Sequence, residues 1–347
     1  MEDIYSLSPS EKVKKLLELP TQIQRTKEWH EARKERITAS EAASVLLMTD
    51  DICDPYIEEF NLNGTTKIHG KRSKVISKDS LDFEKNDRKY CNPYSSKKDF
   101  ILKKRGEGKP FTGNIATRHG QKYEQVAQDI YRRLNGGVKI HEFGMIGHQE
   151  ISFLGASPDG ITETGKMLEI KCPYARIPTG VPPFHYWIQV QLQLQCCYKL
   201  DECDFIECVI TEYNCEDSFM NDYDLQEEQE KGIIIEMKNK SNPDATWYIY
   251  PEYNMADPVE LLEWSHAETK RQKAAITIQK FVKKADYSEW DANAKYWKLE
   301  KIKISTIKRS DKWFNSALKD FSKVWKELKE SKPGEKVKKQ KQLCLFF

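Results

Sequence analysis

The stretch from residue 151 to residue 172 constrains the fold more than any other part of the chain. Its two ends, 151–154 and 167–172, are apolar enough to form strands. Turn-forming residues lie between them, at Asp159-Gly160 and at Thr164-Gly165. Two apolar runs separated by such residues are typical of a β-hairpin. The sequence therefore predicts a hairpin here.

Two carboxylates and a lysine lie in this hairpin. Because strand side chains alternate between faces, Glu169 and Lys171 share one face and Ile170 is buried behind them. Asp159 can join them from the neighbouring strand, and two carboxylates with the Ile170 carbonyl make the all-oxygen ligand set that Mg²⁺ or Mn²⁺ prefers. Lys171 can hold or deprotonate a water and balance charge on a phosphate. A surface hairpin with a Glu–Lys ion pair accounts for the same residues.

Composition limits the class of protein. The chain has 347 residues, enough for one large domain or two small ones, and 32% of them are charged. No apolar run approaches the length of a membrane span, and the first residues lack the pattern of a signal peptide, so a soluble intracellular protein without membrane contact is expected. The nine cysteines form no Cys-x-x-Cys pair, which argues against a zinc ribbon and favours reduced thiols.

Charge is distributed unevenly along the chain. Residues 1–200 carry a net charge of +5, residues 201–263 of −15 and residues 264–347 of +12. The acidic middle is expected to face away from a polyanion such as DNA, whereas the basic last third can approach one. Solvated charged helix faces account for the same lysines.

An anion site is predicted near the amino terminus. Thr38 and Glu41 form a capping box at the start of a helix. The free amides of that helix start, the Ser40 hydroxyl and the Arg33 guanidinium are suited to a phosphate. A capped helix with an exposed arginine accounts for each residue singly.

Two further segments carry candidate residues. A helix with apolar residues at Ala127 and Ile130 ends at 135–137, and Glu124 lies one turn before this apolar stripe. Residues 185–195 are ambiguous, because their apolar residues alternate as in a strand.

Three motifs together resemble a known family. They are Pro158-Asp159 followed after nine residues by Glu169-x-Lys171, Trp29-His30-x-x-Arg33 followed by Ile37-Thr38-Ala39-Ser40, and His119-Gly120-x-x-Tyr123-Glu124. The first resembles the PD-(D/E)xK nuclease superfamily. The other two resemble the lambda-exonuclease and YqaJ-type recombination nucleases of phages and large DNA viruses.

This resemblance implies a fold and an activity. The fold class is α/β, a restriction-endonuclease-like central mixed sheet flanked by helices, with an added helical carboxyl-terminal region. The activity is a Mg²⁺-dependent 5′-to-3′ exonuclease on double-stranded DNA ends, with Mn²⁺ as a substitute, that leaves 3′ single strands for viral recombination, repair or end processing. An endonuclease of the same superfamily on branched or nicked DNA is one alternative. A non-catalytic DNA-end-binding scaffold tethered to a sliding clamp is another.

The resemblance also assigns roles to residues. Asp159, Glu169 and the Ile170 carbonyl bind the metal, and Glu124 completes the site directly or through water. Lys171 orients the attacking water, and Arg33 with Ser40 grips the 5′-phosphate. Residues 185–195 become a helix whose Gln189 helps to place the water, while Gln191 and Gln193 face DNA or solvent.

The chain divides into three expected parts. Residues 1–255 form the nuclease core, interrupted by a polar, irregular insertion at about 48–112 that contains a short basic helix over 97–104. From residue 258 onward apolar residues recur at helical spacing, so 256–331 is predicted to be a helical region packed on the core. A lysine-rich tail follows over 332–347.

The tail ends in a peptide that can bind a partner. Gln340-x-x-Leu343-x-x-Phe346-Phe347 resembles the peptide by which replication and repair proteins hold a sliding clamp of the proliferating-cell-nuclear-antigen type. One helical turn would place the three apolar residues on one face, as a plug for an apolar pocket. A tail tucked onto the core is the alternative.

Other partners follow from the resemblance alone. A single-strand annealing protein and further copies of the chain are left open as partners. The expected location is the host cell, in the cytoplasm or nucleus where viral DNA replicates.

Overall fold

The computed structural model describes residues 4–20, 22–62, 90–108, 113–222, 230–242, 245–283 and 290–334. Its helices are η1 (Ile4–Ser6), α1 (Pro9–Leu17), α2 (Lys27–Lys34), α3 (Ala39–Val45), α4 (Asp50–Glu59), α5 (Lys97–Lys104), α6 (Ile115–Leu134), α7 (Phe184–Cys196), α8 (Glu216–Met220), α9 (Pro258–Lys283) and α10 (Asp311–Glu330). Its strands are β1 (Ile37–Thr38), β2 (Ile140–His141), β3 (Ile146–Gly147), β4 (Leu154–Ala156), β5 (Gly160–Thr162), β6 (Met167–Lys171), β7 (Glu202–Glu212), β8 (Lys231–Asn239), β9 (Thr246–Ile249) and β10 (Trp290–Lys308).

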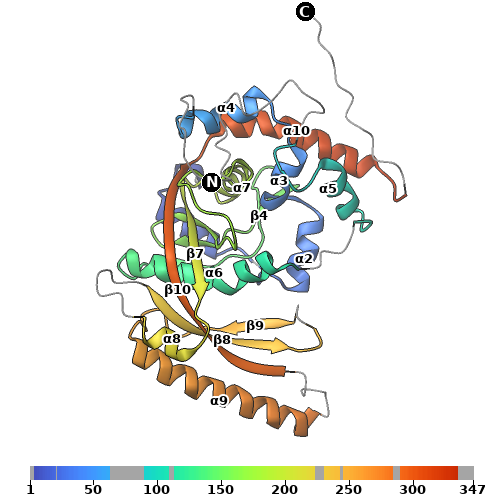
Figure 1. Cartoon of the computed structure of the whole chain (residues 1–347). Coiled ribbons are helices and arrows are strands. Elements are labelled where there is room, and N and C mark those ends of the chain that lie inside the picture. Colours follow the sequence, from blue (N-terminus) through green and yellow to red (C-terminus); the bar gives the residue numbers. More distant parts are fainter. Residues whose placement is uncertain are drawn as a thin grey trace, which may run out of the picture.

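A mixed sheet forms the centre of the molecule (Figure 1). Within the described residues it has seven strands in the order β2-β5-β6-β7-β10-β8-β9. Strands β6 and β7 pair parallel, and the other neighbours pair antiparallel. A smaller sheet has the order β1-β4-β3. The prediction of an α/β fold with a central mixed sheet is confirmed.

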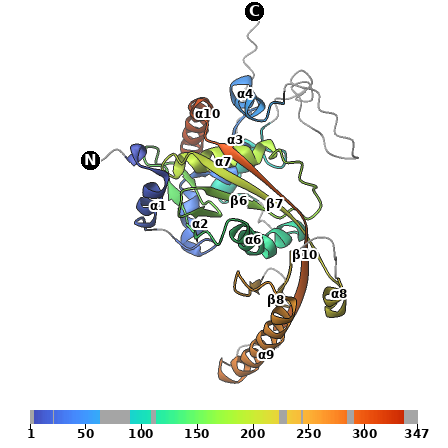
Figure 2. The ribbon, with the colours of Figure 1, turned by 90° about the vertical axis from the view of Figure 1, so that its left-hand side faces the viewer.

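Helices cover both faces of the sheet where the two strands β6 and β7 lie (Figure 2). Met167 belongs to the larger hydrophobic core together with α7, α3, α4 and α10. The next residue, Leu168, belongs to a second core that contains the apolar stripe of α6. The alternation of strand side chains therefore assigns α7 to one face of β6 and α6 to the other.

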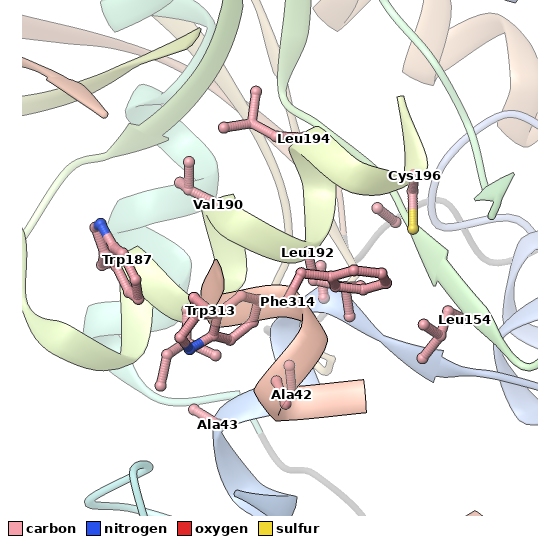
Figure 3. Close-up of a cluster of buried hydrophobic side chains, with 14 of the residues drawn as sticks. Ala42, Ala43, Leu154, Trp187, Val190, Leu192, Leu194, Cys196, Trp313 and Phe314 are labelled. Atoms are coloured by element: carbon pink, nitrogen blue, oxygen red, sulfur yellow. The ribbon is translucent and has the colours of Figure 1, made fainter. Parts of the chain in front are cut away.

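Trp187 of α7 and Trp313 of α10 anchor the larger core (Figure 3). Both side chains are fully buried, and their ring centroids lie 5.7 Å apart in an edge-to-face arrangement. Aromatic pairs of this geometry stabilise a core beyond the area that they bury. The contact fixes α10 against α7, the helix that lies next to the face of β6 with Glu169.

The hairpin prediction is correct for one half and wrong for the other. Strands β5 and β6 pair antiparallel around a turn in which Gly165 has φ +90°. The expected first strand over 151–154 reaches only Leu154, in β4, and β4 pairs with β1 and β3 in the smaller sheet. Asp159 consequently lies in the connection between the two sheets.

The carboxyl-terminal region is not helical throughout. Helices α9 and α10 are present, but β10 lies between them and pairs with β8 over 290–298 and with β7 over 297–308. Lysine alternates with isoleucine over 301–304, and 301–307 is rich in β-branched residues, a pattern that favours a strand. The prediction missed it because helical periodicity on both sides was extended across it.

The prediction of an irregular insertion at about 48–112 is partly wrong. The basic helix over 97–104 is confirmed as α5. Residues 50–59 form helix α4, whose Ile52, Cys53, Tyr56 and Ile57 are buried, and α4 packs against α10. The apolar residues of α4 are spaced so that they lie on one face of the helix, and this face makes α4 part of the core.

No described helix has both the length and the apolar character to cross a membrane.

Candidate active site

Strand β6 presents Glu169 and Lys171 to α7. The Glu169 side chain is fully buried, with 0% of its surface exposed, and its Oε1 accepts an ion-paired hydrogen bond from Lys171 Nζ. Ile170, between them, packs into the opposite core with α6. The predicted arrangement of Glu169 and Lys171 on one face, with Ile170 behind, is therefore found.

Asp159 is held beside this strand by backbone contacts. Its Oδ2 accepts a hydrogen bond of 2.7 Å from the Ile170 backbone N–H. Gln128 Nε2 of α6 donates to the Asp159 carbonyl (3.2 Å), and Gln24 Nε2 donates to the Pro158 carbonyl (3.1 Å). Burial and the negative charge of Glu169 raise the pKa of Asp159 well above its usual range, although Lys171 acts in the opposite direction.

Helix α7 places two glutamines on Glu169. Gln189 Nε2 donates to Oε1 and Gln193 Nε2 donates to Oε2, each at 2.6 Å. Residues four apart lie on the same face of a helix, so one face of α7 holds both oxygens of one carboxylate. The helix predicted for this segment from the resemblance is confirmed.

The expectation that Gln191 and Gln193 face DNA or solvent is wrong. Both side chains are fully buried. Gln191 Nε2 donates to the Lys308 carbonyl and its Oε1 accepts from the Ser310 N–H, each at 2.7 Å. The four-residue spacing from Gln189 was the signal that could have found Gln193.

A cleft of about 430 Å³ lies beside Asp159. Asp159, Glu124 and residues 22–25 are among its lining, together with glutamines of α6 and Tyr250. Glu124 Oε2 is ion-paired with Arg25 Nη2 at 2.9 Å, and its charge is one of those that raise the pKa of Asp159. Arg25 was not found from the sequence, because it reaches Glu124 only through the fold.

The donor set fits a hard divalent cation. Among the described residues, no group of three or more His, Cys, Asp or Glu side chains is arranged to hold a metal. Two carboxylates nevertheless meet here, and burial together with the charge of Glu169 raises the pKa of Asp159. A divalent cation stabilises two adjacent ionised carboxylates, which are also the ligands it prefers.

The predicted phosphate-binding residues are brought together at the start of α3. Arg33 Nη2 donates to Ser40 Oγ at 3.0 Å and to Thr38 Oγ1 at 3.2 Å. The Arg33 guanidinium lies over the Trp29 ring, 4.3 Å from its centroid. Trp29 Nε1 donates to Ser157 Oγ at 2.9 Å, two residues before Asp159. The predicted anion site is thus tied to the connection that carries Asp159.

Glu41 is a carboxylate that contacts Thr38, next to the predicted phosphate-binding residues, and two lysines of α5. Its Oε2 accepts from Thr38 N–H at 3.2 Å, which completes the predicted capping box. Lys104 and Lys103 form ion pairs with it at 2.8 and 3.0 Å. Burial alone would raise the pKa of Glu41, but the positive charges of Lys104, Lys103 and Arg33 outweigh it and hold the pKa at about 2.

The carboxyl-terminal residues Gln340, Leu343, Phe346 and Phe347 lie outside the described residues. Their role in binding a clamp stays a prediction.

A family model matches the middle of the chain. Residues 87–200 match the YqaJ-like viral recombinase domain. The predicted resemblance to this family is confirmed. The YqaJ-like segment contains Glu124, Asp159, Glu169, Lys171 and Gln189, whereas Arg33 and Ser40 precede it. The roles of these residues stay predictions.

One curated relative matches a longer part of the chain than the YqaJ-like segment, and two solved structures are also similar. The chain is 27% identical over 268 residues to the uncharacterized protein R354 of Acanthamoeba polyphaga mimivirus, which covers 67% of this chain and 47% of that protein. It therefore spans about half the length of that relative. Crystal structures of the alkaline exonuclease LHK-Exo from Laribacter hongkongensis, one of them in complex with dAMP, are 19% identical, with TM-scores of 0.41 and 0.40. The matches cover 88% of this chain and 93% of LHK-Exo.

The depressed pKa of Glu41 predicts an acid-sensitive contribution to stability. A pKa of about 2 against an ordinary value of 4.5 means that this contribution is present above pH 4.5 and is lost as the pH falls towards 2. We expect Glu41→Gln to lower the free energy of unfolding by roughly 3 kcal/mol at pH 7. Urea unfolding from pH 7 to pH 2.5 should show the gap to the unmodified protein closing. Glu31→Gln, at an exposed helical ion pair, is the control and should change stability little.

Proposed function

We propose that the chain is a divalent-metal-dependent 5′-to-3′ exonuclease that acts on the ends of double-stranded DNA and leaves 3′ single strands. The observation that carries the proposal is that Glu169 and Lys171 of β6 are ion-paired, while Asp159, bonded to the Ile170 backbone between them, lines the cleft. The match of residues 87–200 to the YqaJ-like viral recombinase domain supports it. Recombination, repair or end processing of viral DNA inside the host cell is the setting that this family suggests.

The residues of the site have separable roles in this proposal. Asp159 and Glu169 hold Mg²⁺, for which Mn²⁺ can substitute, with the Ile170 carbonyl and Glu124 as further oxygen donors. The bound cation supplies Lewis-acid polarisation of the scissile phosphate and activation of a water. The chain's own groups orient that water and exclude the bulk solvent, and Gln189 takes part in its placement.

Lys171 acts as an ammonium. Burial lowers the pKa of a lysine, but the negative charges of Glu169 and Asp159 outweigh burial here and raise the pKa of Lys171 above its ordinary value. In this proposal Lys171 donates hydrogen bonds to the attacking water and balances the charge that develops on the phosphate.

Arg33 and Ser40 explain a preference for ends. A guanidinium and a hydroxyl at the start of α3 offer charge-assisted donors to a terminal phosphate. The Trp29–Ser157 hydrogen bond ties them to the Asp159 connection. A duplex end held there would present its first phosphodiester bonds to the carboxylates, which favours stepwise cleavage from the 5′ end.

The carboxylates are tested by isosteric substitution. Asp159→Asn and Glu169→Gln should each abolish Mg²⁺-dependent cleavage, because one carboxylate cannot replace two around a hard cation. Lys171→Ala should reduce kcat on the order of 10²-fold. Duplex degradation is followed by gel, and DNA binding in EDTA should be retained by all three variants. Mg²⁺-dependent cleavage by both carboxylate variants would overturn the assignment.

The end preference is tested on matched duplexes. Linear DNA with 5′-phosphate should be degraded faster than DNA with 5′-hydroxyl, and Arg33→Ala should remove the difference. Closed circular DNA should resist the protein. Equal cleavage of circles and ends would favour the endonuclease alternative, and binding of ends without cleavage in Mg²⁺ would favour the scaffold.

The tail is proposed to bind a sliding clamp. Deleting residues 340–347, or changing Phe346 and Phe347 to alanine, should leave cleavage of short duplexes unchanged and eliminate clamp binding in a calorimetric titration. The expected Kd of the peptide is near micromolar, or roughly −8 kcal/mol. Loss of folding or of catalysis in the truncated protein would contradict this role and place the tail on the core.

A further inference from the structure

Gln193 is a buried polar side chain to which the sequence motifs assign no role at the metal site. It lies in α7, one helical turn after Gln189, and none of its surface is exposed. A buried amide is costly unless its hydrogen bonds are satisfied. Its partners therefore indicate what the side chain does.

The Gln193 amide nitrogen contacts Glu169 and the segment just before Asp159, whereas its Oε1 has no hydrogen-bond partner among the described residues. Nε2 donates to Glu169 Oε2 at 2.6 Å and also lies 3.4 Å from the Ser157 carbonyl oxygen. Glu169 Oε2 therefore accepts from Gln193, while Oε1 accepts from both Lys171 and Gln189. The two oxygens of the buried carboxylate are thus distinguished by their partners.

Ser157 continues the contact towards the anion site. Its Oγ accepts a hydrogen bond from Trp29 Nε1 at 2.9 Å. The Arg33 guanidinium lies over the Trp29 ring, 4.3 Å from the ring centroid. Arg33 in turn donates to Ser40 Oγ at 3.0 Å. An unbroken series of contacts therefore runs from Glu169 through Gln193 to the group that is suited to a phosphate.

We propose that Gln193 is a positioning residue that holds Glu169 Oε2 and so fixes the orientation of this carboxylate towards a divalent cation. Through Ser157 and Trp29 it also fixes the separation between the carboxylates and Arg33. This inference rests on the proposed function, since it concerns the same cation. It adds a residue for which the three sequence motifs give no role.

Removal of the amide has a defined consequence. Without Gln193 the Oε2 atom is buried and has no described donor, so the carboxylate is free to turn towards Lys171 or the cation. Residues that orient a metal ligand typically contribute 10-fold to 100-fold to metal affinity or activity. The same range is expected here.

Gln191 provides a matched control on the same helix. It is also a fully buried glutamine of α7, but its amide bonds the Lys308 carbonyl and the Ser310 N–H, on the side of β10 and α10. Substitution of Gln191 removes a buried, hydrogen-bonded amide and leaves the hydrogen bonds of Glu169 unchanged. Any effect of helix packing alone should appear equally in both variants.

The test is calorimetric titration of the full chain with Mn²⁺. Gln193→Met, which keeps the length of the side chain and removes the donor, should weaken Mn²⁺ binding by about 10-fold to 100-fold. Gln191→Met should bind Mn²⁺ within about twofold of the unmodified protein. Thermal unfolding in EDTA reports the folding of each variant. Should Gln193→Met fail to fold, Gln193→Asn keeps a polar amide at this position but, being one methylene shorter, places it short of Oε2, and it should show the same loss.

The outcomes separate this inference from the proposed function. Unchanged Mn²⁺ affinity in folded Gln193→Met or Gln193→Asn overturns the positioning role and leaves the metal-dependent nuclease standing. Equal losses in the Gln191 and Gln193 variants also overturn it, since packing alone would then account for the effect. Failure of the unmodified protein to bind Mn²⁺ overturns the proposed function, and the inference with it.

Discussion

The burial of one carboxylate, Glu169, determines how strand β6 and helix α7 must meet. An ionised carboxylate with no exposed surface is unfavourable unless it is paired and hydrogen-bonded. The Glu169 carboxylate accepts hydrogen bonds from the Lys171 ammonium group of its own strand and from two amides on one face of α7. Those donors require α7 to cross β6 in one orientation and one register. The core around Trp187 and Trp313 holds the helix in that position.

The same constraint extends to Asp159 through the backbone. Because Asp159 Oδ2 accepts from the Ile170 N–H, the connection between β4 and β5 is fixed to the strand that carries Glu169. Gln24 and Gln128 fix this connection from two other segments. Contacts within the fold therefore hold the two carboxylates in place before any ligand arrives. Such preorganisation avoids the cost of ordering the site on binding.

Much of the site could be predicted from the sequence, because the spacing of its residues follows from the local geometry of strands and helix starts. The period of a strand relates Glu169 to Lys171, and a capping box relates Thr38 to Glu41. Gln189 was found only through the resemblance, since alternating apolar residues left helix and strand undecided for its segment. Gln193 and Arg25 could not be assigned, because their partners are distant in the chain. Strand β10 was missed for a different reason: its own residues favour a strand, but the helical periodicity of its flanks was extended across it.

Strand β10 has a consequence for how the molecule is made. Its first part pairs with β8 and its second part with β7, which is itself paired with the strand that carries Glu169 (Figure 1). The sheet next to the carboxylates is therefore completed by residues that lie about one hundred positions after β7 in the chain. During synthesis β7 emerges from the ribosome long before its second neighbour does. The amino-terminal part and the carboxyl-terminal region thus share one sheet, and neither can be removed as an independent module without leaving β7 with an unpaired edge.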